Sequence, residues 1–149
     1  MSPPGAPYCY TAPGGLDPVE LGDPTAGEEG SFRTSFGFGP PDHIDVQAYS
    51  VGIDTDELTD QEIVSQLAAV VADLESGGFT FGHEPRRITV DGARAFAYVG
   101  HSVEGGQTIT AHFAFRGETE VQVNCSSTQH ADLIATACAD VLASMQIAS

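Results

Sequence analysis

The chain has 149 residues, with 5 Lys and Arg against 21 Asp and Glu, and therefore a formal net charge of −16. Nucleic acids and anionic membrane surfaces are excluded as partners, because phosphate-rich surfaces need a basic face. With 41% hydrophobic residues the chain can bury a core. Its length suits one domain, which we place at residues 8–147, after a flexible N-terminal segment at 1–7.

The N-terminal third is rich in Pro and Gly up to residue 31, which leaves room only for short extended pieces. From Phe32 to Phe38 apolar and polar residues alternate, and this period of two predicts a half-buried strand. After Gly39-Pro40-Pro41, a second strand places Ile44, Val46 and Ala48 on one side.

A helix is predicted over residues 58–76. Thr59-Asp60-Gln61-Glu62 is a capping box, in which the threonine hydroxyl and the glutamate each satisfy a free backbone N–H. Apolar residues follow at helical spacing and predict a stripe that packs on the sheet. This stripe is Ile63, Leu67, Val70 or Val71, and Leu74, and Gly77-Gly78 ends the helix.

Five strands come next, at 79–81, 86–90, 93–101, 107–115 and 119–125, and Asp91-Gly92 predicts a tight hairpin. We expect a three-residue turn at Arg116-Gly117-Glu118, which places Phe115 opposite Thr119. This register sets Phe113 against Val121 and Ala95 against Phe113, so that apolar residues meet. A last helix runs from about Gln129 to Met145.

The order of elements predicts an α+β fold, an antiparallel meander β-sheet with two main helices packed on it. The chain has no G-x-S-x-G, P-loop, G-x-G-x-x-G or H-E-x-x-H motif. We therefore predict no enzyme activity, no catalytic residue and no cofactor.

The acidic run from Asp54 to Glu62 does not fit a calcium loop, since Thr59 stands where the sixth-position glycine belongs. It suits the approach to a helix N-terminus. The histidines are scattered, and His43 with Asp45 supplies only two ligands. We therefore predict no metal site. The five are His43, His83, His101, His112 and His130.

The strand face opposite the expected core carries aromatic residues among polar ones, and such a surface can form the floor of a ligand site. The alternative is that a helix or the N-terminal segment covers it. The candidate ligand face comprises Arg94, Phe96, Tyr98, Thr110 and His112, beside Glu120, Gln122 and Asn124.

Several motifs are similar to those of small actinobacterial envelope proteins and lipoproteins of the PsbP-like and Mog-like superfamily. They are Tyr8-Cys9-Tyr10, Asp42-x-Ile44-x-Val46, Val90-Asp91-Gly92, Phe115-Arg116-Gly117, and Val123-Asn124-Cys125 followed by Cys138-x-x-Val141-Leu142. The resemblance covers residues 8–147. It implies an antiparallel sheet between helices and a role as a binding or assembly module, such as a photosystem accessory subunit or a Ran-binding protein. It maps no site residue.

The three cysteines indicate in which cellular compartment the protein folds. Cys125 ends the last long strand on its apolar side, and Cys138 lies on the apolar stripe of the helix that follows, so we predict a disulfide between them. Cys9 is then the odd cysteine, either free or pairing in place of one of the two. The alternative is three reduced, buried cysteines in a cytosolic protein.

A disulfide implies an oxidising compartment. The segment Met1–Pro7 has no signal-peptide pattern, and the residues before Cys9 do not fit a lipoprotein cleavage site. Either the protein is cytoplasmic or its leader has been removed, and the predicted disulfide favours an extracytoplasmic or cell-envelope location.

The expected function is a non-catalytic binding or accessory domain with a protein partner. One alternative is a small-molecule carrier or small enzyme that uses the Phe96/Tyr98/His112 face. Another is an intracellular, immunity-type protein that binds a partner.

Overall fold

A computed structural model describes residues 7–11, 17–18, 32–37, 42–76, 78–82, 85–102 and 106–148. Residues 1–6 of the predicted N-terminal segment, Phe38, Gly77 and His83 lie outside the described residues. The elements are β1 (Tyr8–Cys9), β2 (Asp17–Pro18), β3 (Phe32–Gly37), β4 (His43–Ser50), the 3-10 helix η1 (Thr55–Glu57), α1 (Asp60–Ser76), β5 (Phe79–Phe81), β6 (Arg86–Val90), β7 (Ala93–Ser102), β8 (Thr108–Arg116), β9 (Thr119–Ser127), α2 (Ala131–Ser144) and β10 (Gln146–Ile147).

One antiparallel sheet dominates the fold, with strand order β2-β3-β4-β9-β8-β7-β5 and with β6 also paired to β7. β1 and β10 form a separate two-stranded ribbon, which joins the two ends of the described chain. The predicted α+β class is confirmed. No helix among the described residues is both long and apolar enough to span a membrane.

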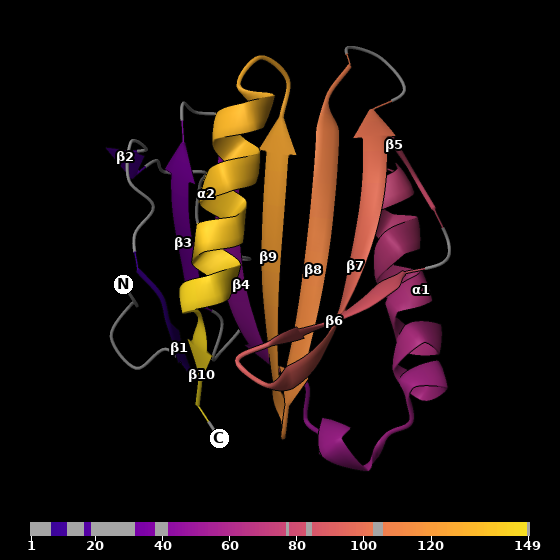
Figure 1. Cartoon of the computed structure of the whole chain (residues 1–149). Coiled ribbons are helices and arrows are strands. Elements are labelled where there is room, and N and C mark those ends of the chain that lie inside the picture. The colour runs from indigo at the N-terminus through magenta and orange to yellow at the C-terminus, as the bar shows by residue number, and fades with distance from the viewer. Residues whose placement is uncertain are drawn as a thin grey trace.

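The two helices lie on opposite faces of the sheet (Figure 1). α2 covers β4 and β9 and buries Ile134, Ala137, Cys138 and Val141. α1 packs over β7 and β8 on the other face, where its Ile63, Leu67 and Val71 are buried. The helix stripe predicted from the sequence is therefore the packed side of α1, with Val70 and Leu74 partly buried at its margin.

Two predicted local signals, the capping box at the start of α1 and the Asp91-Gly92 hairpin, are confirmed. The backbone N–H of Glu62 donates to the Thr59 hydroxyl and the N–H of Thr59 donates to the Glu62 carboxylate, both at 3.1 Å. Asp91 and Gly92 form a two-residue turn with φ of 52° and 74°, as the type I′ hairpin requires.

One predicted register is wrong, at the turn between β8 and β9. Arg116 pairs with Thr119, so the turn contains two residues and not three, and Gly117 adopts φ 57° at its first position. A shift of one residue turns a strand over. Because β7 also pairs with β8 one residue away from the predicted register, β7 and β9 keep their predicted faces. β8 alone is inverted.

The inversion of β8 moves its aromatic residues under α1. Phe113 and Phe115 join Phe96 and Tyr98 there, with Tyr98 and Phe113 edge to face at a centroid distance of 5.9 Å. Small residues then face α2, where Ala114 lies between Ala95 and Val121. Core clusters therefore lie on both faces of the sheet, and matching apolar residues across β8 and β9 favoured the wrong orientation of β8, since the observed register sets Phe113 against Gln122.

Asp42 caps α2 from a distant part of the chain. Its carboxylate accepts the backbone N–H groups of Thr128 (2.7 Å), Gln129 (3.1 Å) and His130 (3.0 Å). The residue at the N-cap position, His130, makes no side-chain cap of its own. Burial raises the pKa of Asp42, but the three N–H donors and the nearby His130 outweigh it and hold the pKa below its usual value.

Candidate functional site

A groove of about 420 Å³ lies between α2 and the part of β8 that the helix leaves open. Such a volume is within the usual range of small-molecule sites. In Figure 1, α2 stands over one half of the sheet, and the strands beside it carry no helix on that side. The groove is lined by Arg86 of β6, by Thr108, Thr110 and His112 of β8, by Cys125 and Ser127 of β9, and by Ala131, Ile134, Ala135, Cys138, Ala139 and Leu142 of α2.

Strand pairing explains why these side chains meet. Arg86 pairs with Ala97, Ala97 pairs with His112, and His112 pairs with Val123, so the four residues form one row across the sheet. Because the side chain of Ala97 is a single methyl group, the side chains of Arg86 and His112 on either side of it are near neighbours. The opposite wall of the groove is apolar, because α2 contributes mainly alanine, isoleucine and leucine side chains to it.

His112 is the buried polar group of this groove, with only 5% of its surface exposed. Its Nδ1 lies 3.0 Å from the carbonyl oxygen of Val123. Because a carbonyl only accepts, Nδ1 carries the proton and donates it. Burial lowers the pKa of His112 and the charge of Arg86 lowers it further, against the opposing effect of the Val123 hydrogen bond. The ring is therefore neutral, with Nε2 as an acceptor.

The disulfide between Cys125 and Cys138 forms the floor of the groove and ties β9 to α2, with the two Cα atoms 6.1 Å apart. Sulfur atoms of the two cysteines and a ring nitrogen of His112 all lie within 4.8 Å of one another. Disulfide sulfurs are not thiolates, and thiolates are the sulfur ligands that metals take. In the oxidised protein this cluster therefore offers His112 alone. Cys9 is not in a disulfide.

Charge distinguishes the groove from the rest of the surface. None of the described residues that line it is acidic, although the chain has 21 Asp and Glu. Among the arginines whose side chains the structure describes, Arg86 alone makes neither an ion pair nor a hydrogen bond. An exposed, unpaired guanidinium beside a neutral imidazole and two threonines suits a ligand with an anionic group.

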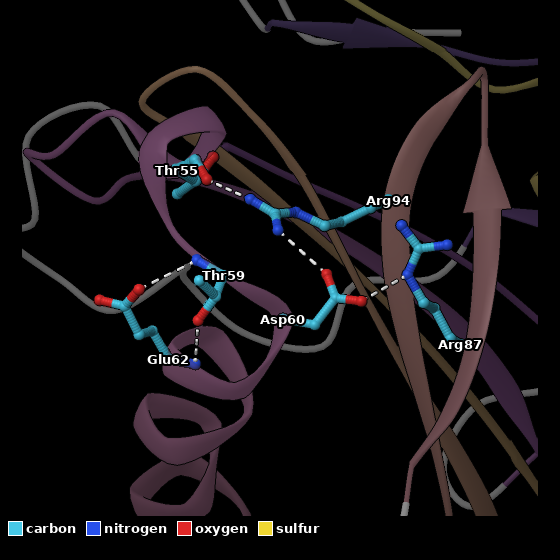
Figure 2. Close-up of polar contacts among 6 residues, drawn as sticks. All are labelled: Thr55, Thr59, Asp60, Glu62, Arg87 and Arg94. Atoms are coloured by element: carbon cyan, nitrogen blue, oxygen red, sulfur yellow. Dashed lines mark hydrogen bonds and ion pairs between the residues drawn. The ribbon is translucent and has the colours of Figure 1, made fainter.

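The other arginines are engaged in structural contacts. Figure 2 shows Asp60 of α1 between Arg94 of β7, at 3.0 Å, and Arg87 of β6, at 2.8 Å. Arg94 also donates to the carbonyl of Thr55. The hydrogen bond from Arg94 is the main cause that lowers the pKa of Asp60. Arg116 pairs with Asp91 at 3.0 Å and donates to the carbonyl of Ile147 at 2.6 Å, next to the ribbon of β1 and β10.

The acidic run also has local roles. Asp54 accepts the backbone N–H of Asp56 at 3.0 Å and so caps η1. Asp60 fastens the start of α1 to the sheet, and Glu62 completes the capping box (Figure 2). These contacts agree with the predicted approach to a helix N-terminus.

The predicted ligand face is not a single face. Thr110 and His112 line the groove beside α2, whereas Phe96 and Tyr98 lie under α1 with 3% exposure each. Arg94 faces the α1 side, where Asp60 and Thr55 occupy its donors. The inversion of β8 is the cause of this separation. Phe96 and Tyr98 are core residues, as the alternative of a covering helix anticipated.

Sequence reasoning missed Arg86 and the α2 wall. A signal was present, because Thr108, Thr110 and His112 put polar groups on one side of an otherwise apolar strand. Ala131, Ala135 and Ala139 likewise recur every four residues and mark a flat helix face.

The fold is of the PsbP-like type, as the comparisons with solved structures show. No protein-family model matches the chain, and no curated protein matches it in sequence. The solution structure of cyanobacterial PsbP (CyanoP) from Synechocystis sp. PCC 6803 is similar, with a TM-score of 0.64 and 15% identity over 99% of this chain and 90% of that chain.

LpqN of Mycobacterium tuberculosis, described as involved in cell envelope biogenesis, is also similar. Its TM-score is 0.57 and its identity 11%, over 95% of this chain and 83% of that one. At such identities the likeness establishes the fold, two helices packed on an antiparallel sheet.

Proposed function

We propose that this protein is a non-catalytic, ligand-binding accessory domain and that its groove beside α2 holds a small molecule with an anionic group. The observation that carries the proposal is the unpaired Arg86 over a groove with no carboxylate among the lining residues that the structure describes. The anionic group would meet Arg86, a donor on the ligand would meet Nε2 of His112, and the apolar part would lie along α2.

The groove lacks the arrangement of a nucleophile beside a base among its described lining residues. Its cysteines are joined to each other, and the proton on Nδ1 of His112 is held by a backbone carbonyl. Activated nucleophiles need a free hydroxyl or thiol within hydrogen-bonding reach of a base. This chemistry supports binding and not turnover.

An extracytoplasmic or cell-envelope location forms part of the proposal. The disulfide favours an oxidising compartment, and it speaks against the intracellular, immunity-type alternative. The similarity to LpqN, a protein involved in cell envelope biogenesis, points the same way. Together with this location, we propose that the protein is related to actinobacterial envelope lipoproteins.

The experiment is a titration with octanoate, a carboxylate on a short alkyl chain, followed by 1H–15N NMR. Saturable shifts are expected at groove residues such as Thr110, Ala135 and Leu142, and weaker binding is expected for the neutral alcohol 1-octanol. Arg86→Gln should weaken octanoate binding about tenfold or more, since a charge-assisted hydrogen bond contributes about 1.5–3 kcal/mol.

The matched control is Arg87→Gln, one residue away on the opposite face, where the guanidinium pairs with Asp60. It should leave octanoate binding unchanged. Equal binding by the Arg86→Gln variant and the wild type, or shifts that avoid the groove, would refute the proposal.

A further inference from the structure

A second pocket lies on the other side of the sheet, at the end where α1 begins, with a volume of about 210 Å³. It is separate from the groove beside α2, and nothing in the proposed function uses it. The lining consists of Val51, Ile53, Thr55, Leu58, Ile63, Gln66, Leu67, Val70, Phe115 and Glu120.

The wall of this pocket is fixed by hydrogen bonds to the β8–β9 turn. The backbone N–H and the hydroxyl of Thr55 both donate to the carbonyl of Gly117, at 2.7 and 2.6 Å. The N–H of Val51 donates to the carbonyl of Glu118 at 2.9 Å. Thr55 itself is 2% exposed. These hydrogen bonds therefore hold the segment from Val51 to Thr55 in a fixed position over the sheet. It forms one wall of the pocket, and α1 forms another.

Among the lining residues in the described part of the chain, the carboxyl of Glu120 is the one ionisable side chain, and its neighbours are mostly apolar. Phe115 stands across from it on β8 and Tyr49 on β4. Several acidic groups around the pocket are exposed to solvent: Asp54, Asp56, Glu57, Glu62 and Glu118. The less exposed charged groups on the neighbouring elements have partners of their own, since Asp60 pairs with Arg87 and Arg94, Arg116 pairs with Asp91, and Asp45 of β4 accepts a hydrogen bond from Gln47. Burial alone raises the pKa of Glu120 to about 7.

An ionised carboxylate in apolar surroundings is costly unless a cation accompanies it. No arginine is among the described residues that line this pocket, and the chain has no lysine, so none of these side chains supplies a cation and a ligand can. The mouth of the pocket is apolar as well, because Val51 and Ile53 are 37% and 43% exposed. The net charge of −16 raises the local concentration of cations.

We propose that this pocket binds a small primary amine with an apolar body, with the ammonium group at the carboxylate of Glu120. The apolar body would lie among Ile63, Leu67 and Phe115, and the ring of Phe115 adds a cation–π partner. The volume is below that of drug-sized sites, so the ligand class is that of a compact arylalkyl or cycloalkyl amine.

The test is a titration of the whole protein with phenethylamine, 2-phenylethanol and phenylacetate, followed by 1H–15N NMR. Phenethylamine should give saturable shifts at the pocket lining and should bind at least about tenfold more tightly than the alcohol at about pH 8.5. Its ammonium group stays protonated there, since amines of this kind titrate near pH 10. Phenylacetate should not bind at this pocket.

The pH dependence follows from the ionisation of Glu120. With a pKa of about 7, the carboxyl is mostly charged at about pH 8.5 and mostly neutral at about pH 5.5. Phenethylamine should therefore bind about tenfold or more weakly at the lower pH, and the alcohol should bind equally at both.

Glu120→Gln should remove this pH dependence and the preference for the amine over the alcohol. The matched control is Glu118→Gln, an exposed glutamate two residues earlier, which should change neither. Two results with the wild-type protein alone would overturn the proposal. One is that it binds the amine no better than the alcohol, and the other is that its binding of the amine does not depend on pH. An unaltered pH profile in a folded Glu120→Gln protein also overturns it.

Discussion

Removing the Cys125–Cys138 disulfide should destabilise the protein by about 3 kcal/mol. The bond closes a loop with a sequence separation of 13. In the chain-entropy model a closed loop of this size lowers the entropy of the unfolded chain by about 10 cal/mol/K, or about 3 kcal/mol near 25 °C. Both cysteines are 7% exposed and belong to the core between α2 and the sheet.

Urea unfolding measures this loss. The oxidised wild type is compared with the reduced wild type and with the Cys125→Ala/Cys138→Ala variant. With a dependence of about 1–3 kcal/mol/M in urea, the midpoint should fall by about 1–3 M in both. The control is Cys9→Ser, which should leave the midpoint nearly unchanged, because Cys9 is not in a disulfide.

Two results would refute this reasoning. Three alkylatable thiols in the denatured, unreduced protein would show that the bond does not form, and the argument for an oxidising compartment would go with it. A midpoint that does not change on reduction would show that the bond forms but does not constrain the unfolded chain in the way the loop-closure argument requires. Peptide mapping without reductant separates the two cases, since it shows whether the Cys125 and Cys138 peptides are linked.

Three further changes test the core and the caps by urea unfolding. Leu67→Ala should cost about 2–5 kcal/mol, because Leu67 is 2% exposed on the side of α1 that packs on the sheet, and a change of a few tenths of a kcal/mol would contradict its place in the core. Thr59→Ala should cost about 1 kcal/mol through the lost cap, and an unchanged midpoint would count against the capping box. Asp42→Asn should cost about 1–2 kcal/mol at neutral pH, because the three N–H groups then donate to a neutral amide oxygen in place of a carboxylate, and charge-assisted hydrogen bonds are the stronger ones. Because the pKa of Asp42 is lower in the folded protein, its contribution is full above about pH 4 and is lost as the pH falls through the folded value. The difference between Asp42→Asn and the wild type should therefore shrink in acid, and a difference that is constant with pH would refute the cap.

The sequence by itself determined the local elements. The capping box at Thr59, the helical stripe from Ile63 to Leu74 and the Asp91-Gly92 hairpin all describe interactions between residues close in the chain, and the structure has each of them. These elements, in their order, were enough for the α+β class. The positions of Cys125 and Cys138 on apolar faces likewise sufficed to predict their pairing.

The tertiary structure decided which way β8 faces. The predicted register pairs apolar residues across β8 and β9, whereas the observed one, shifted by one residue, sets Phe113 against Gln122 and Phe115 against Glu120. The aromatic side chains of β8 are buried in the core under α1 instead, because helices bury both faces of this sheet. Matching apolar residues across strands is a reliable guide to register where only one face of the sheet is buried. The two-residue turn therefore places His112 on the opposite face of the sheet from Phe96 and Tyr98. In this way it divides the predicted ligand face into two halves.

The candidate site and the cap of α2 depend on contacts between distant segments. Arg86 reaches His112 only because β6, β7 and β8 align one row of residues, and Asp42 caps a helix that begins almost ninety residues later. No local periodicity encodes such neighbours, since they result from strand pairing across the whole sheet. The sequence therefore determined the elements and their apolar faces, and only the folded sheet decided which polar groups meet on it.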